Sequence, residues 1–327
     1  MDETVMRLNV DAPCWDQTNF IGRLKYFFSI TDPRHVLASE EQLYKAKELL
    51  ALYRLGKEPS GTTNEQVLYA KKLYESAFHP DSGELQNVFG RMSFQVPGGM
   101  AITGCMLQFY RTTSAIVFWQ WVNQSFNALV NYTNRNAQSE LNLGKIAFAY
   151  ISATTSAVIT AVGLKNFLKH RASPLMQRFV PFAAVAAANC VNIPLMRQSE
   201  LTDGIAVFDD NGQRVTESKV AAAKAISQVV FSRIFMAAPG MILCPVIMEN
   251  IEKYHWMKQV KPLHAPLQVL VVGCFLIFMV PVGCALFPQR CSLKIESLQR
   301  WEPDKYAVAI ETSKVSNLTH VYFNKGL

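Results

Sequence analysis

The chain has 327 residues, of which 50% are hydrophobic and only 17% are charged. Soluble domains carry about 25% charged residues on average, so this chain is poor in charge. Five apolar runs of roughly 20 residues fall within residues 97–289, and water-soluble helices rarely stay uncharged over such lengths. The composition therefore excludes an ordinary soluble helical protein and predicts an all-α, multi-pass transmembrane protein with about five spans.

The net charge of +7 does not indicate a nucleic-acid partner. The basic residues lie in the N-terminal segment and in short loops between apolar runs, which is the distribution that membrane topology produces. Membrane lipids with anionic headgroups are the expected partner instead. The loop 165–178 is a candidate cardiolipin site, because it holds four basic residues and no acid: Lys165, Lys169, Arg171 and Arg178.

Residues 1–95 predict a helical, amphipathic segment that is soluble or lies on the membrane surface. Within 15–28, one helical face collects Phe20, Ile21, Leu24, Phe27 and Phe28. Ser39 with Gln42 and Thr63 with Gln66 form the capping-box pattern of two further helices, and Gly56 can end the first of them. The N-terminus has acidic residues and no apolar stretch, so no secretory signal peptide is predicted.

The membrane domain is predicted over residues 96–289, followed by a C-terminal tail, 290–327. Its spans are expected near 100–121, 146–164, 179–196, 225–248 and 265–289. The first apolar region is longer than one span of roughly 30 Å, and Arg111 interrupts it. Either one span covers 100–121 with Arg111 inside, or 98–110 is an interfacial or re-entrant piece and 112–132 is the span. The first interpretation is adopted here.

Five spans place the two termini on opposite sides of the membrane. In this topology the basic loops 165–178 and 249–264 lie on the N-terminal side. The positive-inside rule then places the N-terminus inside. The sequence shows no internal repeat, so it gives no sign of an inverted-repeat transporter fold.

A stripe of amide side chains is the most informative polar feature. Gln120, Gln124, Asn127, Asn131 and Asn134 follow one another at steps of four, three, four and three, which is one face of a helix. Amides donate and accept hydrogen bonds without net charge, so such a face suits the path of a small polar solute. The alternatives are interhelical hydrogen bonds, worth roughly 0.6–2 kcal/mol each, and a simple exit of the helix into water.

Polar residues also fall inside two later spans. Asn189 and Asn192 lie one turn apart, just before Pro194, and Arg233 precedes Pro239. Each proline leaves a backbone carbonyl free, and free carbonyls beside amides are typical of broken-helix binding sites. The Arg233 guanidinium could hold a carboxylate in bidentate fashion, and the alternatives are snorkelling to the membrane surface or a structural ion pair.

We therefore predict a substrate-binding set made of Arg233, Gln124, Asn127, Asn131, Asn189 and Asn192. No catalytic motif of hydrolases, P-loop enzymes or zinc proteases occurs. The seven cysteines and six histidines show no paired ligand spacing. Neither an enzyme nor a cofactor or metal site is expected.

Four segments resemble the sideroflexin family. They are FHPDSGE at 78–84 with GRMS at 90–93, FWQWVNQSFN at 118–127, PFAAVAAANCVNIP at 181–194, and NKGL at 324–327. The segment FQVPGGM at 94–100 is most similar to the second paralogue of the family. Ser82 stands where the family more often has Thr, and this change keeps the hydroxyl.

The resemblance implies a mitochondrial inner-membrane carrier whose N-terminus faces the matrix and whose C-terminus faces the intermembrane space. It implies transport of small neutral amino acids, serine foremost, in support of one-carbon metabolism, and a link to mitochondrial iron and haem homeostasis. It supplies no catalytic residues. A non-transporting scaffold that recruits iron or haem machinery through residues 1–95 is the alternative, and homo-oligomers or protein partners remain open.

Overall fold

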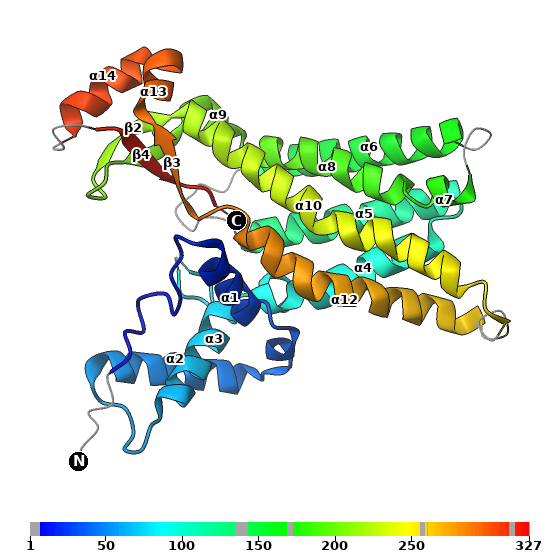
Figure 1. Cartoon of the computed structure of the whole chain (residues 1–327), viewed down its shortest axis with the longest axis horizontal. Coiled ribbons are helices and arrows are strands. Elements are labelled where there is room, and N and C mark those ends of the chain that lie inside the picture. The colour runs from blue at the N-terminus through cyan, green and yellow to red at the C-terminus, as the bar shows by residue number, and fades with distance from the viewer. Residues whose placement is uncertain are drawn as a thin grey trace.

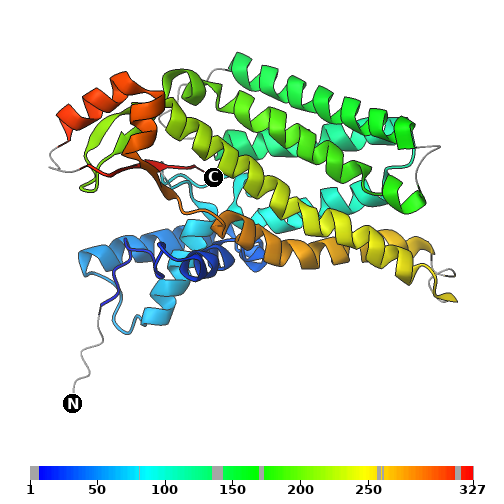
Figure 2. The same ribbon diagram turned by 45° about the horizontal axis from the view of Figure 1, so that its top comes forward.

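The computed structural model describes residues 7–80, 82–134, 143–168, 173–255, 259, 261–313 and 318–326. Three parts are visible in Figure 1: a group of N-terminal helices, a bundle of long helices, and a small sheet flanked by short helices. The N-terminal group and the sheet both lie at one end of the bundle, as the turned view in Figure 2 also shows.

The N-terminal helices are α1 (Phe20–Ile30), η1 (Pro33–Leu37), α2 (Glu40–Leu55) and α3 (Asn64–Ala77). Both predicted capping boxes are confirmed, since Ser39 and Thr63 each accept from the third residue of the helix that follows. Gly56 ends α2 in the left-handed region at φ 70°, where a residue without Cβ is favoured. α2 and α3 pack together through a shared apolar core that includes Leu43, Leu50, Val67 and Leu73.

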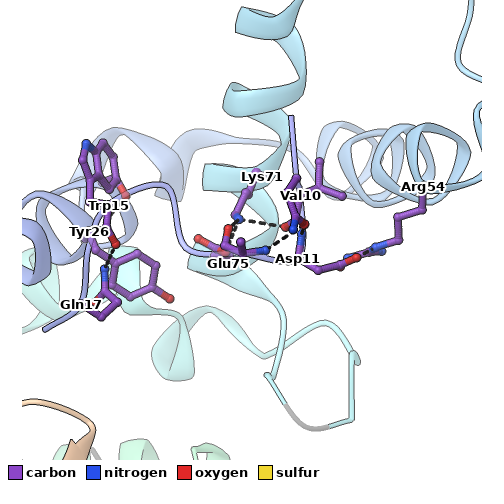
Figure 3. Close-up of polar contacts among 11 residues, drawn as sticks. Val10, Asp11, Trp15, Gln17, Tyr26, Arg54, Lys71 and Glu75 are labelled. Carbon is purple, nitrogen blue, oxygen red and sulfur yellow. Dashed lines mark hydrogen bonds and ion pairs between the residues drawn. The ribbon is translucent and has the colours of Figure 1, made fainter. Parts of the chain in front are cut away.

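The segment before α1 is held on α2 and α3 by polar contacts (Figure 3). Lys71 Nζ donates to the Val10 carbonyl at 2.8 Å and to the Ala12 carbonyl, and lies 3.6 Å from the Glu75 carboxylate. Burial raises the pKa of that carboxylate, while Lys71 opposes the shift. The N-terminal segment is therefore packed against these helices.

The bundle consists of α4 (Gln95–Phe109), α5 (Thr113–Thr133), α6 (Leu143–Leu168), α8 (Val180–Met196), α10 (Lys219–Ile251) and α12 (His264–Ala285), with short η2 (Val88–Gly90), η3 (Met92–Phe94), α7 (Pro174–Gln177) and η4 (Lys261–Leu263) between them. Among the described residues, three helices are long and apolar enough to cross a membrane: Ala147–Leu168, Lys219–Ile251 and His264–Ala285. Val180–Met196 is a shorter apolar helix. The predicted class, a multi-pass helical membrane protein, is confirmed.

The six bundle helices form a closed ring. Each contacts the next in chain order, and the last, α12, returns to contact α4. The contact between α6 and α8 is extensive, because a stripe of alanines four residues apart on α6 is fully buried: Ala149, Ala153, Ala157 and Ala161. Small side chains let two helix backbones approach closely in membranes.

The first predicted span is wrong. The chain does not form one helix over 100–121, because α4 ends at Phe109 and Thr112 begins α5 by accepting from Ala115 N–H. Arg111 is exposed in the turn between the two helices. The alternative break near Arg111 is the one that forms, and α4 is an integral part of the ring, with Val96 and Met106 almost fully buried.

Different contacts occur at the two ends of the bundle. At the end where α4 meets α5 and α6 meets α7, which we call the loop end, Lys165 Nζ donates to the Arg111 carbonyl and Arg178 pairs with Glu252 at 3.0 Å. Lys169 and Arg171 lie outside the described residues, so the cardiolipin site stays a prediction. At the opposite end, which we call the domain end, Arg23 of α1 donates to the Ala285 carbonyl at 2.9 Å.

Because six described helices alternate in direction, the N-terminal helices and the C-terminal sheet share the domain end (Figures 1 and 2). The break at Arg111 adds a helix to the bundle in a region that was interpreted as one span, and this is why both terminal parts lie at the same end. On which side of the membrane each terminus lies stays a prediction.

The predicted C-terminal tail is folded. It contributes β3 (Arg290–Lys294), α13 (Ile295–Trp301), α14 (Pro303–Thr312) and β4 (His320–Asn324), which combine with α9 (Gln198–Asp203), β1 (Ile205–Phe208) and β2 (Arg214–Ser218). The strands form one antiparallel sheet in the order β2-β1-β4-β3. Its core includes Val207, Val215, Leu298 and Phe323.

Candidate substrate path in the helical bundle

The amide stripe of α5 faces the interior of the ring. Gln120 is 0% exposed and Gln124 is 2% exposed, whereas Phe118 and Trp121 on the other face are 50% and 51% exposed. Asn127 and Asn131 are partly buried. A simple exit of this face into water is therefore excluded, and the aromatic face is the one that lipid would cover.

The middle of the stripe is unpaired. Gln120 Nε2 donates to the Tyr110 hydroxyl at 2.6 Å, and Asn134 donates to the Gly90 carbonyl at 3.0 Å. Between them, Gln124, Asn127 and Asn131 form no hydrogen bond with any described residue. Interhelical hydrogen bonding does not account for these three amides, so they are free to bind a solute or water.

The two asparagines of α8 are also unpaired. Asn192 is 5% exposed, Asn189 is partly buried, and neither forms a hydrogen bond within the described part of the chain. The expected broken helices are not found, because α8 runs through Pro194 and α10 runs through Pro239 without interruption. A proline removes one backbone bond, and packing against neighbouring helices maintains the rest of the helix.

Arg233 lies on the buried side of α10. It shares a helical face with Ile226, Val229, Ala237 and Gly240, and the first two are each 4% exposed. This position argues against snorkelling to the membrane surface. Arg233 has no ion pair or hydrogen bond among the described residues, and the titratable group that interacts with it is the Cys284 thiol of α12.

Arg233 is partly buried and lies within a helix that is long and apolar enough to cross a membrane. An arginine inside such a helix costs roughly 2.5–3.5 kcal/mol on the insertion scale. An anion that reaches Arg233 would offset this cost and could be bound through two parallel N–H donors. The chemistry available here is recognition of a carboxylate.

All six predicted residues lie in the half of the bundle toward the domain end. They occupy the second half of α5, the second half of α8 and the first half of α10. No hydrogen bond joins Arg233 to the amides, and the structure gives no single cluster that contains all six. The arrangement is a polar section of the ring interior.

The loop-end half is closed by apolar packing. Met106, Val185 and Met241 are at most 9% exposed and pack with Trp119 and Phe182, so helices α4, α5, α8 and α10 meet there. Apolar side chains therefore separate the polar section from the loop end.

Sequence reasoning missed three further polar groups. Gln95 Nε2, Asn123 Nδ2 and Ser232 Oγ are buried and have no partner among the described residues. Asn123 lies four residues before Asn127, so helical periodicity could have found it, whereas Ser232 is adjacent to Arg233 in sequence and no periodic signal marks it. Asn123 and Ser232 add buried polar groups to α5 and α10, and Gln95 adds one to α4.

These features define a multi-pass helical membrane protein with a closed ring of helices and a polar interior section. The sequence model of the sideroflexins matches residues 9–327, and the chain belongs to this family. It is 61% identical to sideroflexin-2 of Mus musculus and 54% identical to that of Drosophila melanogaster, each over 327 residues and 100% of both chains. No solved structure matches the chain.

The comparisons also distinguish the paralogues. Identity to sideroflexin-1 of Mus musculus is 53% over 325 residues, or 99% of both chains, against 61% for sideroflexin-2 of the same animal. The resemblance to the second paralogue is therefore confirmed. Family membership fits a carrier-type transporter and gives no catalytic relative, while the six site residues stay predictions.

Proposed function

We propose that the protein is a mitochondrial inner-membrane transporter of small neutral amino acids, with serine as its main substrate. It would support one-carbon metabolism and be linked to mitochondrial iron and haem homeostasis. The observation that carries the proposal is the unpaired Arg233 in the same half of the ring as unpaired, inward-facing amides.

The polar section matches the groups of a serine zwitterion. The carboxylate would bind the Arg233 guanidinium. The ammonium group needs acceptors and the hydroxyl needs both donors and acceptors, which the amides of Gln124, Asn127 and Asn131 offer. Asn189 and Asn192 would supply a second set from α8. The apolar closure at the loop end would have to open for transport, as alternating access requires.

We further propose that the domain end faces the matrix, as the family resemblance implies for the N-terminus. The C-terminal sheet would then face the matrix as well. This replaces the orientation expected from five spans. The expectation that the basic loops lie on the N-terminal side is wrong for their described residues, because Lys165, Arg178 and Lys253 lie at the loop end, so the positive-inside rule no longer supports this orientation and the family resemblance alone carries it.

The test is uptake of radiolabelled serine into proteoliposomes that contain the purified protein. We expect saturable uptake, and a loss of at least tenfold at low serine concentration in Arg233→Ala, because a charge-assisted bidentate contact is worth roughly 1.5–3 kcal/mol. The matched control is Arg300→Ala, since Arg300 is exposed on α13, and it should transport like the parent.

Three outcomes are informative. Normal uptake by Arg233→Ala would support transport but would show that the substrate carboxylate binds elsewhere than at Arg233. Loss of uptake in Asn127→Ala with normal uptake in Arg233→Ala would place the site on α5. Folded parent protein without uptake above empty vesicles would contradict the proposal and favour the scaffold that acts through residues 1–95.

A further inference from the structure

Lys325 is buried at the domain end of the bundle, close to the C-terminus. It is 3% exposed, and its Nζ is 3.4 Å from the Phe287 carbonyl, just beyond α12. Its backbone N–H donates to the Gln289 carbonyl at 2.8 Å, and its own carbonyl accepts from Arg197 at 2.9 Å. The backbone therefore fixes this lysine where α8 and α12 end.

The charges around Lys325 leave it without an anion. The titratable groups that interact with it are two thiols, Cys284 and Cys291, and two guanidinium groups, Arg23 and Arg197. Burial lowers the pKa of Lys325, the two thiols oppose this shift, and the two arginines add to it. No carboxylate among the described residues interacts with it.

The neighbouring arginines are already occupied. Arg197 pairs with Glu200 at 2.6 Å. Arg23 donates to the carbonyls of Gln17, Thr18 and Ala285. Lys325, by contrast, has one long hydrogen bond and a contact with the Phe287 ring, and Arg233 has no hydrogen bond among the described residues. Neither cation has an anionic partner within the described part of the chain, so both could bind an anionic ligand.

The two cations lie near the same end of α12, although they come from distant parts of the chain. Phe231, two residues before Arg233 on α10, has its ring centroid 6.1 Å from that of Phe287, and Lys325 Nζ lies 5.9 Å from the Phe287 ring centroid. Cys284 lies in the last turn of α12, so the pair marks a route from the domain end into the polar section. Two cations along such a route would attract a carboxylate and pass it inward.

We propose that Lys325 is the outer binding residue for the carboxylate of the transported amino acid, which then moves past Cys284 to Arg233. This inference rests on the proposed function and adds an entry residue to it. The C-terminal segment thereby becomes part of the substrate path.

A structural alternative exists. Lys325 and Arg23 both hold carbonyls at the end of α12, and cations are favourable at a helix C-terminus. A residue with only this role would affect stability without changing how the protein recognises a carboxylate. The experiment must separate the two roles.

The first measurement is the concentration dependence of serine uptake by Lys325→Met in full-length protein. We expect the KM to rise roughly tenfold, because one charge-assisted contact is lost on the entry path. Lys325→Arg should recover most of the affinity. The matched control is Lys294→Met, because Lys294 is exposed on β3 and should leave the KM unchanged.

The second measurement uses Cys284 as a native reporter, in a variant that keeps it as its single cysteine. Serine should slow its reaction with a small methanethiosulfonate reagent, and Lys325→Met should weaken this protection. A variant that keeps only Cys14, which is exposed in the N-terminal segment, should show no protection.

The outcomes separate the inference from the proposed function. A normal KM in Lys325→Met, with or without a lower Tm, would overturn the inference while the transporter stands. If the parent shows no uptake, the reporter still decides: protection of Cys284 by serine supports the carboxylate route, and its absence overturns it.

Discussion

His35, in the N-terminal helices, is a buried titratable residue whose surroundings predict a pH effect. It is 8% exposed, its Nδ1 has no partner among the described residues, and its ring lies edge-on to Tyr69. Burial lowers its pKa from the ordinary value of about 6.5, with Arg34 and Lys72 adding to the shift and Asp32 opposing it.

The folded state therefore favours the neutral ring. Its contribution to stability is complete above about pH 6.5 and is lost as the pH falls from there through the lowered pKa of the folded state. We expect the Tm of the intact protein in detergent to fall between pH 7 and pH 5. His35→Phe should reduce this fall, and equal pH slopes for the two proteins would contradict the argument.

At the residue scale, periodicity predicted the inward face of α5 correctly, because Gln120 and Gln124 lie on one helical face with the buried Ile116. The sequence could not predict the burial of Lys325. That lysine is covered only because β4 joins the sheet and the chain then returns to the end of α12.

The contact between α4 and α12 closes the ring, and Gly104 is the glycine at which the α12 backbone itself comes close. A Cβ added at Gly104 would lie 2.7 Å from the Val269 Cα, and a backbone atom cannot move aside alone. Gly104→Ala should therefore separate the two helices and lower stability by about 1–3 kcal/mol.

Thermal unfolding of the intact protein measures this effect. The matched control is Gly163→Ala in α6, since no atom lies within 4 Å of the added Cβ. It should be neutral or stabilising by roughly 0.5–1 kcal/mol, because alanine favours a helix over glycine. Equal Tm changes in the two variants would refute the close approach at Gly104.

At the element scale, local signals were reliable and distant ones were not. The capping boxes at Ser39 and Thr63 involve residues three apart, and both formed. A helix start at residue 112 was one of two interpretations, and the long apolar region favoured the other, a single span over 100–121, which is wrong. The strands were missed because β1 pairs with β4, more than a hundred residues later, and short strands have no pattern of their own.

The first turn of α10 shows the same long-range dependence. Ser218 caps this helix, and the Glu302 carboxylate accepts from the backbone N–H groups of Lys219 and Val220 at 2.9 and 3.3 Å. A carboxylate is favourable at a helix N-terminus. The C-terminal residues thus stabilise the start of a membrane helix from which they are distant in sequence.

At the scale of the whole molecule, the ring predicts a shared side for the two termini. Tags placed at the N-terminus and at the C-terminus should respond alike to a protease that is added to mitochondria with a ruptured outer membrane. Both tags should be protected if the domain end faces the matrix. Digestion of one tag alone would show that the chain crosses the membrane an odd number of times, so that at least one of the six bundle helices does not span it.

The ring and the sheet are both completed by the end of the chain. α12 fills the place between α10 and α4, and β4 lies between β1 and β3. Since a chain is made from its N-terminus, neither part can close until its last residues have been synthesised. A premature stop near residue 318 would therefore remove Lys325 and β4, which lies between two other strands of the sheet. We expect quality-control proteases to degrade such a protein, although it would be only slightly shorter.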